Sequence, residues 1–292
     1  MKLLAKFNVI LGLVFGAGLA IAAAVSHQFL QKEAREEVVR QARLMMEAMR
    51  SARDYTTKQV KPLLVTQQEH QRSFLPQTVP AFAATESFAY LRASYPDYAY
   101  KEATLNPTNL RDRAVDWEAD VINTFRNRPG GAKEVVGERD TPTGRSLYLA
   151  RPIRADQPCL ECHSTSRAAP AAMIRRYGPN NGFGWQPSEI VGAQVVSVPM
   201  AVPVEMANQA FQTLVIYLSA IFVASLILLD MLLLFIVVRP LRRLSTTADQ
   251  ISLGQMDMPE LPVRGSDEIA VLAGSFNRMW RSLKQALKML EG

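Results

Sequence analysis

Hydrophobic residues gather in two stretches of the chain that are long enough to cross a bilayer. Residues 9–25 carry no charge, and residues 213–238 carry a single one, Asp230. A spanning helix needs about 20 apolar residues, so each stretch predicts a transmembrane helix. A cleaved signal peptide over residues 1–24 is the alternative for the first. A carboxylate is costly in lipid, and we expect Asp230 to lie near the inner end of its helix, close to Arg239.

Basic residues flank both apolar stretches. Lys2 and Lys6 precede the first, and Arg239, Arg242 and Arg243 follow the second. Positive flanks stay in the cytoplasm, so both termini are predicted inside and the middle of the chain outside. Much of the formal net charge of +6 is therefore explained by membrane topology, and it does not indicate a nucleic-acid partner.

Between the two spans, the pattern predicts helices first and strands later. Apolar positions recur at helical spacing over residues 27–66, with Pro62 marking the expected end of that helix. Residues 71–107 are rich in proline and aromatics, which suggests loops and short helices. A second helix is expected to start at Thr108 or Asn109, either of which could cap it.

Three strands are predicted after these helices. Residues 134–139 and 145–153 flank the turn sequence 141–144, and residues 189–199 form the strongest alternating β-branched run. Helices followed by a small antiparallel sheet indicate an α+β domain with a PAS-like arrangement.

After the second span, two short heptad seams are separated by a connector rich in proline and glycine. The first seam is Leu241, Leu244, Ala248 and Ile251; the second is Ile269, Leu272, Phe276, Met279, Leu283, Ala286 and Leu290. Two such seams cannot bury themselves within one chain. They predict a parallel homodimer that forms a helical coiled-coil bundle.

The two cysteines carry the strongest chemical signal. They read Cys159-Leu160-Glu161-Cys162-His163, the C-x-x-C-H pattern of c-type haem attachment. In that chemistry each thiol bonds one vinyl side of the haem, and the histidine provides the proximal nitrogen to the iron. The motif also lies in the compartment where such attachment takes place. We therefore expect one covalent haem c.

Three other interpretations of this motif fit less well. A structural zinc site needs four ligands, and the chain has three histidines and no second cysteine pair. A thioredoxin-like motif should open a helix after a buried strand, whereas Asp156-Gln157-Pro158 precede Cys159. A disulfide across two intervening residues would close a strained loop.

Further haem contacts are predicted on weaker grounds. Lys101, Arg111 and Arg113 are candidate partners for the haem propionates, because carboxylates are well served by charge-assisted hydrogen bonds. As solvated helix charges they would have no such role. Met49, on the apolar face of the first helix, is the candidate sixth ligand of the iron, although a methionine there is more often a core residue. His70 lies in a polar run and fits a solvated loop.

Two known modules resemble parts of this sequence. Residues 239–287 resemble a HAMP linker through Arg239-Pro240-Leu241, Gly254, Asp267-Glu268-Ile269 and Phe276-Asn277-Arg278-Met279. The outer domain resembles the c-haem, PAS-like sensor domains of bacterial membrane receptors. The residues that carry this second resemblance are Arg53–Thr56, Tyr100–Asn109, Cys159–His163 and Gly182–Trp185. It implies a haem sensor; the HAMP resemblance implies that Glu268 holds the connector in register. Some members use a further cysteine as second axial ligand, and this chain has none to spare.

The expected organisation and function follow from these observations. The segments are a cytoplasmic N-terminus (1–8), a first transmembrane helix (9–25), a periplasmic haem domain (26–212), a second transmembrane helix (213–238) and a cytoplasmic HAMP module (239–292). The resemblance implies a bacterial inner-membrane sensor of redox state or of CO, NO or O2, acting on a separate output partner. The alternative is an anchored monohaem cytochrome that passes electrons to a redox partner. No acid–base or nucleophile constellation indicates an enzyme.

Overall fold

The computed structural model describes residues 3–65, 73–127, 131–142, 144–255 and 257–290. It contains two compact units. One comprises residues 27–210, and the other comprises residues 1–26 together with 211–292. Each unit is described by itself.

A four-stranded antiparallel sheet forms the centre of the 27–210 unit. Its strands are β1 (Ala99–Thr104), β2 (Val135–Thr141), β3 (Gly144–Arg154) and β4 (Ile190–Pro199), in the order β1-β4-β3-β2. β2 and β3 form the hairpin predicted from the turn sequence. The connection between β3 and β4 carries the C-x-x-C-H motif, as expected.

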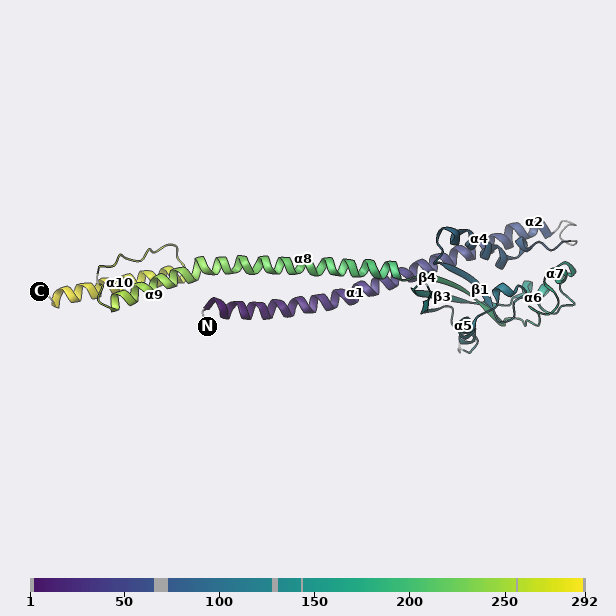
Figure 1. Ribbon diagram of the computed structural model, residues 1–292, viewed down its shortest axis with the longest axis horizontal. Helices are drawn as coiled ribbons and strands as arrows, with labels where there is room; N and C mark the ends of the chain where they lie inside the picture. The colour runs from purple at the N-terminus through teal and green to yellow at the C-terminus, as the bar shows by residue number, and fades with distance from the viewer. Residues whose placement is uncertain (1–2, 66–72, 128–130, 143, 256, 291–292) are drawn as a thin grey trace. The chain divides into compact units, whose positions relative to one another are not determined.

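Helices cover both faces of this sheet. Helix α1 (Leu3–Tyr55) and helix α4 (Pro80–Ser94) pack on one face, and helix α5 (Asp116–Asn127) packs on the other; Figure 1 shows α4 and α5 on opposite sides of the strands. The first core contains Val38, Ala42, Met46, Met49, Ala84, Phe88, Tyr100, Leu147, Leu149, Val196, Val198 and Met200. The second contains Ala103, Val121, Ile122, Phe125, Ala150, Ile190, Ala193 and Val195. The mixed helical and antiparallel architecture is confirmed.

Strand β1 and helix α4 lie within the stretch predicted as loops and short helices, so that part of the prediction is wrong. β1 reads Ala-Tyr-Lys-Glu-Ala-Thr, and its Glu102 is only 4% exposed. A buried carboxylate needs paired partners. Arg53 forms an ion pair with Glu102, and the Tyr100 hydroxyl donates to it at 2.7 Å. Tyr100 lies two residues away on the same face of β1, whereas Arg53 comes from α1, a position that a local pattern cannot reveal as a neighbour.

The helix that contains α1 continues past its predicted end. Residues Thr56–Val60 form a π-helical turn, η1, and helix α2 (Lys61–Val65) follows directly. The N–H of Lys61 donates to the Thr56 carbonyl five residues back. This widened turn just before Pro62 adjusts the hydrogen bonding where the proline has no N–H to donate, so the proline does not end the helix.

The second predicted helix also starts later than expected. Asn109 does cap a turn, because its side chain accepts from the N–H of Arg111, but that turn is the 3-10 segment η3 (Leu110–Asp112). Helix α5 begins only at Asp116. The remaining short elements of this unit are η2 (Pro76–Thr78), α6 (Gln157–His163) and α7 (Ala171–Tyr177).

Two helices are long and apolar enough to cross a membrane. The apolar windows lie within Leu4–Leu64 and Ala201–Ser252, with mean hydropathies of 2.4 and 3.0. No part of either window is buried, in contrast to the core helix of a soluble protein. The second stretch consists of α8 (Ala201–Leu233), the π-helical turn η4 (Leu234–Val238) and α9 (Arg239–Ser252).

Asp230 has a different neighbour from the one expected. The side-chain amide of Asn8 donates to Asp230 at 2.9 Å, whereas Arg239 lies over the ring of Phe235. The second carboxylate oxygen of Asp230 is buried without a hydrogen-bond partner among the described atoms. A polar partner from another apolar helix is the usual way to accommodate a charge at such a position.

Helices α9 and α10 (Glu268–Leu290) are separated by a connector. α9 is joined to α10 by residues 253–267, as the two seams predicted. Asn277 holds the connector, since its side-chain amide donates to the Leu261 carbonyl at 2.8 Å and its carbonyl accepts from the Leu261 N–H at 3.0 Å. Glu268 is exposed, and no hydrogen bond or ion pair joins it to the described part of the connector. Asn277 thus ties the connector to α10 within a single chain, and the role expected of Glu268 stays a prediction.

Candidate functional site

Helix α6 arranges the two thiols and the histidine of the motif. Asp156 caps this helix by accepting from the Cys159 N–H at 3.2 Å, and Pro158 occupies its first turn, where a missing N–H costs nothing. Residues three apart lie on the same side of a helix. Cys159 and Cys162 therefore project from one side, with His163 at the end of the same turn. Both cysteines are free and partly buried.

The environment of the cysteines holds them as protonated thiols. Burial, helped by the hydrogen bond that the Cys159 thiol donates to Asp156 at 2.7 Å, raises the pKa of Cys159 to about 11. Burial likewise raises the pKa of Cys162. Redox-active C-x-x-C pairs have the opposite property, a lowered pKa that provides a thiolate. The thioredoxin-like interpretation is therefore disfavoured on physical grounds.

His163 is fixed as a neutral imidazole with a defined tautomer. Its Nδ1 lies 2.7 Å from the Gly182 carbonyl oxygen, which can only accept, so Nδ1 carries the hydrogen. Nε2 then holds a lone pair that can bind a metal. Burial lowers the pKa of His163, against the opposing effect of the Gly182 bond. The ring stacks on Trp185 with 4.0 Å between centroids.

The loop that carries Gly182 is itself held by two other segments. The Gly182 N–H donates to the Asn106 side chain at 3.2 Å, and the Thr108 hydroxyl lies 3.5 Å from Nδ1 of His163. The Trp185 N–H donates back to the His163 carbonyl at 3.2 Å. The structure thus brings together at one imidazole three segments that the sequence singled out separately.

Basic groups from the long helical segment act on the two thiols. The positive charge of Arg53 favours ionisation of Cys159, and that of Lys61 favours ionisation of Cys162, although burial outweighs both effects on the thiol pKa values. Sequence reasoning did not propose either residue for a cofactor site. Arg53 occurs in a segment that carried a resemblance, but Lys61 had no distinguishing signal.

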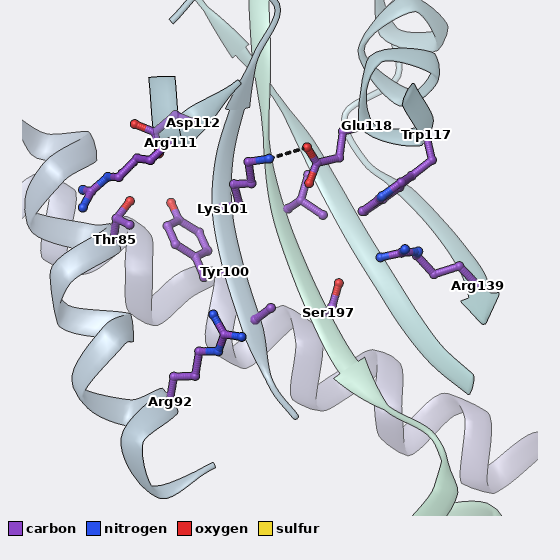
Figure 2. Close-up of a pocket in the computed structure, with 12 residues that line it drawn as sticks. Thr85, Arg92, Tyr100, Lys101, Arg111, Asp112, Trp117, Glu118, Arg139 and Ser197 are labelled. Atoms are coloured by element: carbon purple, nitrogen blue, oxygen red, sulfur yellow. Dashed lines mark hydrogen bonds and ion pairs between the residues drawn. The ribbon is translucent and has the colours of Figure 1, made fainter. Parts of the chain in front are cut away.

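The predicted propionate partners lie elsewhere in the unit. Lys101 pairs with Glu118 at 2.7 Å, as the dashed line in Figure 2 shows, and Arg111 pairs with Glu86 at 2.6 Å. Lys101 and Arg111 line a pocket whose lining residues include none of the C-x-x-C-H motif. The Arg113 carbonyl accepts from Lys101 at 2.7 Å. Their contact with propionates stays a prediction.

The roles of His163 and Met49 as iron ligands also stay predictions. Met49 is 8% exposed and packs in the core between α1, α4 and the sheet. His70 falls in residues 66–72, outside the described residues. Among the described residues, no three His, Cys, Asp or Glu side chains cluster closely enough to hold a metal ion, as a structural zinc site would require.

The contact between Gly182 and Thr108 can be tested with a matched pair of substitutions. Gly182 and Gly184 have φ angles of 83° and 84°, so alanine is strained at both. Only at residue 182 would the new Cβ overlap the Thr108 side chain and lie 2.8 Å from its backbone nitrogen. Gly182→Ala should lower the free energy of unfolding by about 1–3 kcal/mol more than Gly184→Ala. Denaturant unfolding of the full chain in detergent measures this, and equal losses would contradict the tight contact.

Comparison with known proteins adds independent information on both parts of the chain. The model of a family described as Tll0287-like matches residues 31–199, and the HAMP domain model matches residues 232–285. No curated protein sequence matches. A similar solved structure is the crystal structure of the cyanobacterial heme-protein Tll0287, with 13% identity and a TM-score of 0.44, over 56% of this chain and 95% of that one.

The first of these matches is extensive. It covers more than half of the 292 residues and includes all of β1 to β4, the C-x-x-C-H motif and the loop around Gly182. The chain therefore belongs to the Tll0287-like family, and a HAMP domain follows the family's domain.

Proposed function

We propose that this chain is a membrane-anchored sensor that carries one covalently bound haem c in a periplasmic, PAS-like domain. The observation that carries the proposal is the geometry at His163. Its Nδ1 is committed to a backbone carbonyl, and two protonated thiols lie one helical turn apart beside it.

The residues of α6 fit the chemistry of haem attachment. Each thiol, Cys159 or Cys162, would add across one vinyl group, with sulfur bonding one carbon and hydrogen the other. His163 would provide the proximal nitrogen through Nε2, and the Gly182 carbonyl would keep the ring oriented and raise its basicity. Bound haem would supply an iron that changes oxidation state or binds a diatomic gas.

Two apolar helices support anchoring in a bacterial inner membrane. Their basic flanks favour cytoplasmic termini and an outer haem domain. The same long helix contains the first apolar segment and, further along, the core residues Val38 to Met49 and Arg53. A change at the haem that shifts the second span would reach the HAMP domain as a change of packing, because α8 continues through η4 into α9. The response would pass to a separate output partner.

A second copy of the chain is the expected partner of the HAMP helices. Within one chain, Ala270, Ala273 and Trp280 of α10 are buried, while the apolar side chains of Leu272 and Met279 are 46% and 60% exposed. An apolar stripe of this kind on a helix calls for another helix. We propose a parallel homodimer through this region. We assign no catalytic residue, and no enzymatic activity is proposed.

The covalent link is tested by removing both thiols. The denatured chain should keep its haem stain after acid–acetone extraction, because thioether bonds survive unfolding. The Cys159→Ser, Cys162→Ser double variant should lose the stain, since a serine hydroxyl does not form the thioether. The chain has no other cysteine that could be replaced as a matched control. Ser164→Ala, directly after the motif, therefore serves as the control and should keep the stain. A double variant that stains as strongly as the parent would refute the proposed attachment.

The sixth iron position separates the sensor from the alternative, an electron-carrying cytochrome. A gas sensor needs an open or displaceable sixth ligand, whereas an electron carrier keeps strong ligands in both oxidation states. If Met49 is a weak ligand, CO should shift the ferrous absorption spectrum, and Met49→Ala should alter that spectrum before CO is added. Met46→Ala, in the same helix and core, is the control for packing. A ferrous spectrum insensitive to CO and to Met49→Ala would favour the electron carrier.

A further inference from the structure

A pocket of about 270 Å3 lies on the face of the sheet that also packs against α5. Its lining comes from α4, β1, β2, β4, the start of α5 and the turn η3, and it contains none of the residues of the C-x-x-C-H motif. The volume is close to the lower end of the range for small-molecule sites. It leaves room for a ligand of a few carbon atoms.

Positive charge dominates this pocket. Four basic side chains line it, Arg92, Lys101, Arg111 and Arg139, against two acidic ones, Asp112 and Glu118. The lining residues alone therefore carry a net charge of +2. Glu86 offsets part of this excess from outside the lining, and a cleft lined mainly by one sign of charge attracts ligands of the opposite sign.

Two of the four cations have no carboxylate partner in the described part of the chain. Lys101 and Arg111 are committed to Glu118 and Glu86. Arg139 lies over the ring of Trp117 at 4.3 Å, and neither Arg139 nor Arg92 forms an ion pair with another described residue. A guanidinium group offers paired donors that match a carboxylate. Both free groups are therefore available to a ligand.

The free guanidinium groups approach from opposite sides. Figure 2 shows Arg92 reaching in from α4 and Arg139 reaching in from β2, with Ser197 between them. The apolar side chains of Ala99 and Val195 form part of the floor. A ligand that suits this arrangement has an anionic group at each end and a short apolar middle.

We propose that this pocket binds a small organic dicarboxylate, with one carboxylate on Arg92 and the other on Arg139. Each carboxylate of the ligand would meet one of the two guanidinium groups that lack an ion pair, and the hydroxyl of Ser197 can donate a further hydrogen bond. The site is separate from the proposed haem attachment. It would give the domain a second chemical input.

Calorimetric titration of the full, haem-loaded chain in detergent tests this proposal with succinate as the probe. Butyrate has the same number of carbon atoms and only one carboxylate, and inorganic phosphate has charge without a carbon chain. Succinate should bind saturably and butyrate roughly tenfold more weakly or not at all, because one charge-assisted contact is lost. Butyrate or phosphate binding as tightly as succinate would overturn the dicarboxylate assignment, as would the absence of succinate binding.

Substitutions locate the binding. Arg92→Gln and Arg139→Gln should each weaken succinate binding by roughly tenfold or more. Arg154→Gln, at an exposed arginine of β3 outside the pocket, should leave it unchanged. Unfolding midpoints without ligand show whether each variant is folded, and Arg139→Lys should retain part of the affinity. Succinate affinity unchanged in both glutamine variants, or a haem absorption change on binding that persists in them, would place the ligand elsewhere and overturn the proposal.

Discussion

The hydrogen bond from Nδ1 of His163 to the Gly182 carbonyl is the constraint on which the candidate site depends. It selects the tautomer that leaves Nε2 able to bind a metal, and it sets the plane of the ring against Trp185. The carbonyl occupies that position only because residue 182 has a positive φ and no Cβ to overlap Thr108. The chemical capacity of a histidine in α6 thus depends on a glycine nineteen residues later.

A second polar contact ties the long helical segment to the sheet near the same site. Arg53 of α1 pairs with Glu102 of β1, whose other oxygen accepts from Tyr100, and Tyr100 in turn accepts from Gln194 of β4 at 3.2 Å. Burial raises the pKa of Tyr100, which therefore stays a hydroxyl donor. Removing one partner of a buried pair leaves the other charge uncompensated, at a cost of about 3–5 kcal/mol. The network fixes the helix in one register against the sheet.

Local sequence patterns predicted the parts of the fold that follow one regular period. Alternating β-branched residues indicated β4, the turn sequence indicated the β2–β3 hairpin, and heptad spacing indicated α9 and α10. Strand β1 escaped notice because Glu102 occupies an inward position, and its burial depends on Arg53. Helix α4 escaped notice because aromatic and proline residues around it lack a clear helical period.

The same contrast holds for the candidate site. Cys159, Cys162 and His163 lie within five consecutive residues, so the haem-attachment motif could be predicted from the sequence alone. The surroundings of these residues could not, because they come from distant segments. Gly182 was noticed only as part of a resemblance, and the proximity of Lys61 to Cys162 depends on the helix continuing beyond Pro62. The sequence did not predict β1, and so it could not show that Lys101 of this strand pairs with Glu118 or that Arg111 of η3 pairs with Glu86.

We propose that the state of the haem alters the packing of the HAMP helices. The most direct measurement is bismaleimide cross-linking between chains in nanodiscs for Leu272→Cys, with Arg281→Cys as the outward-facing control, in the ferrous state with and without CO. We expect more cross-linking at residue 272 than at residue 281, and a change in the cross-linked fraction at residue 272 when CO binds. Equal cross-linking at both positions, unaffected by CO, would contradict it.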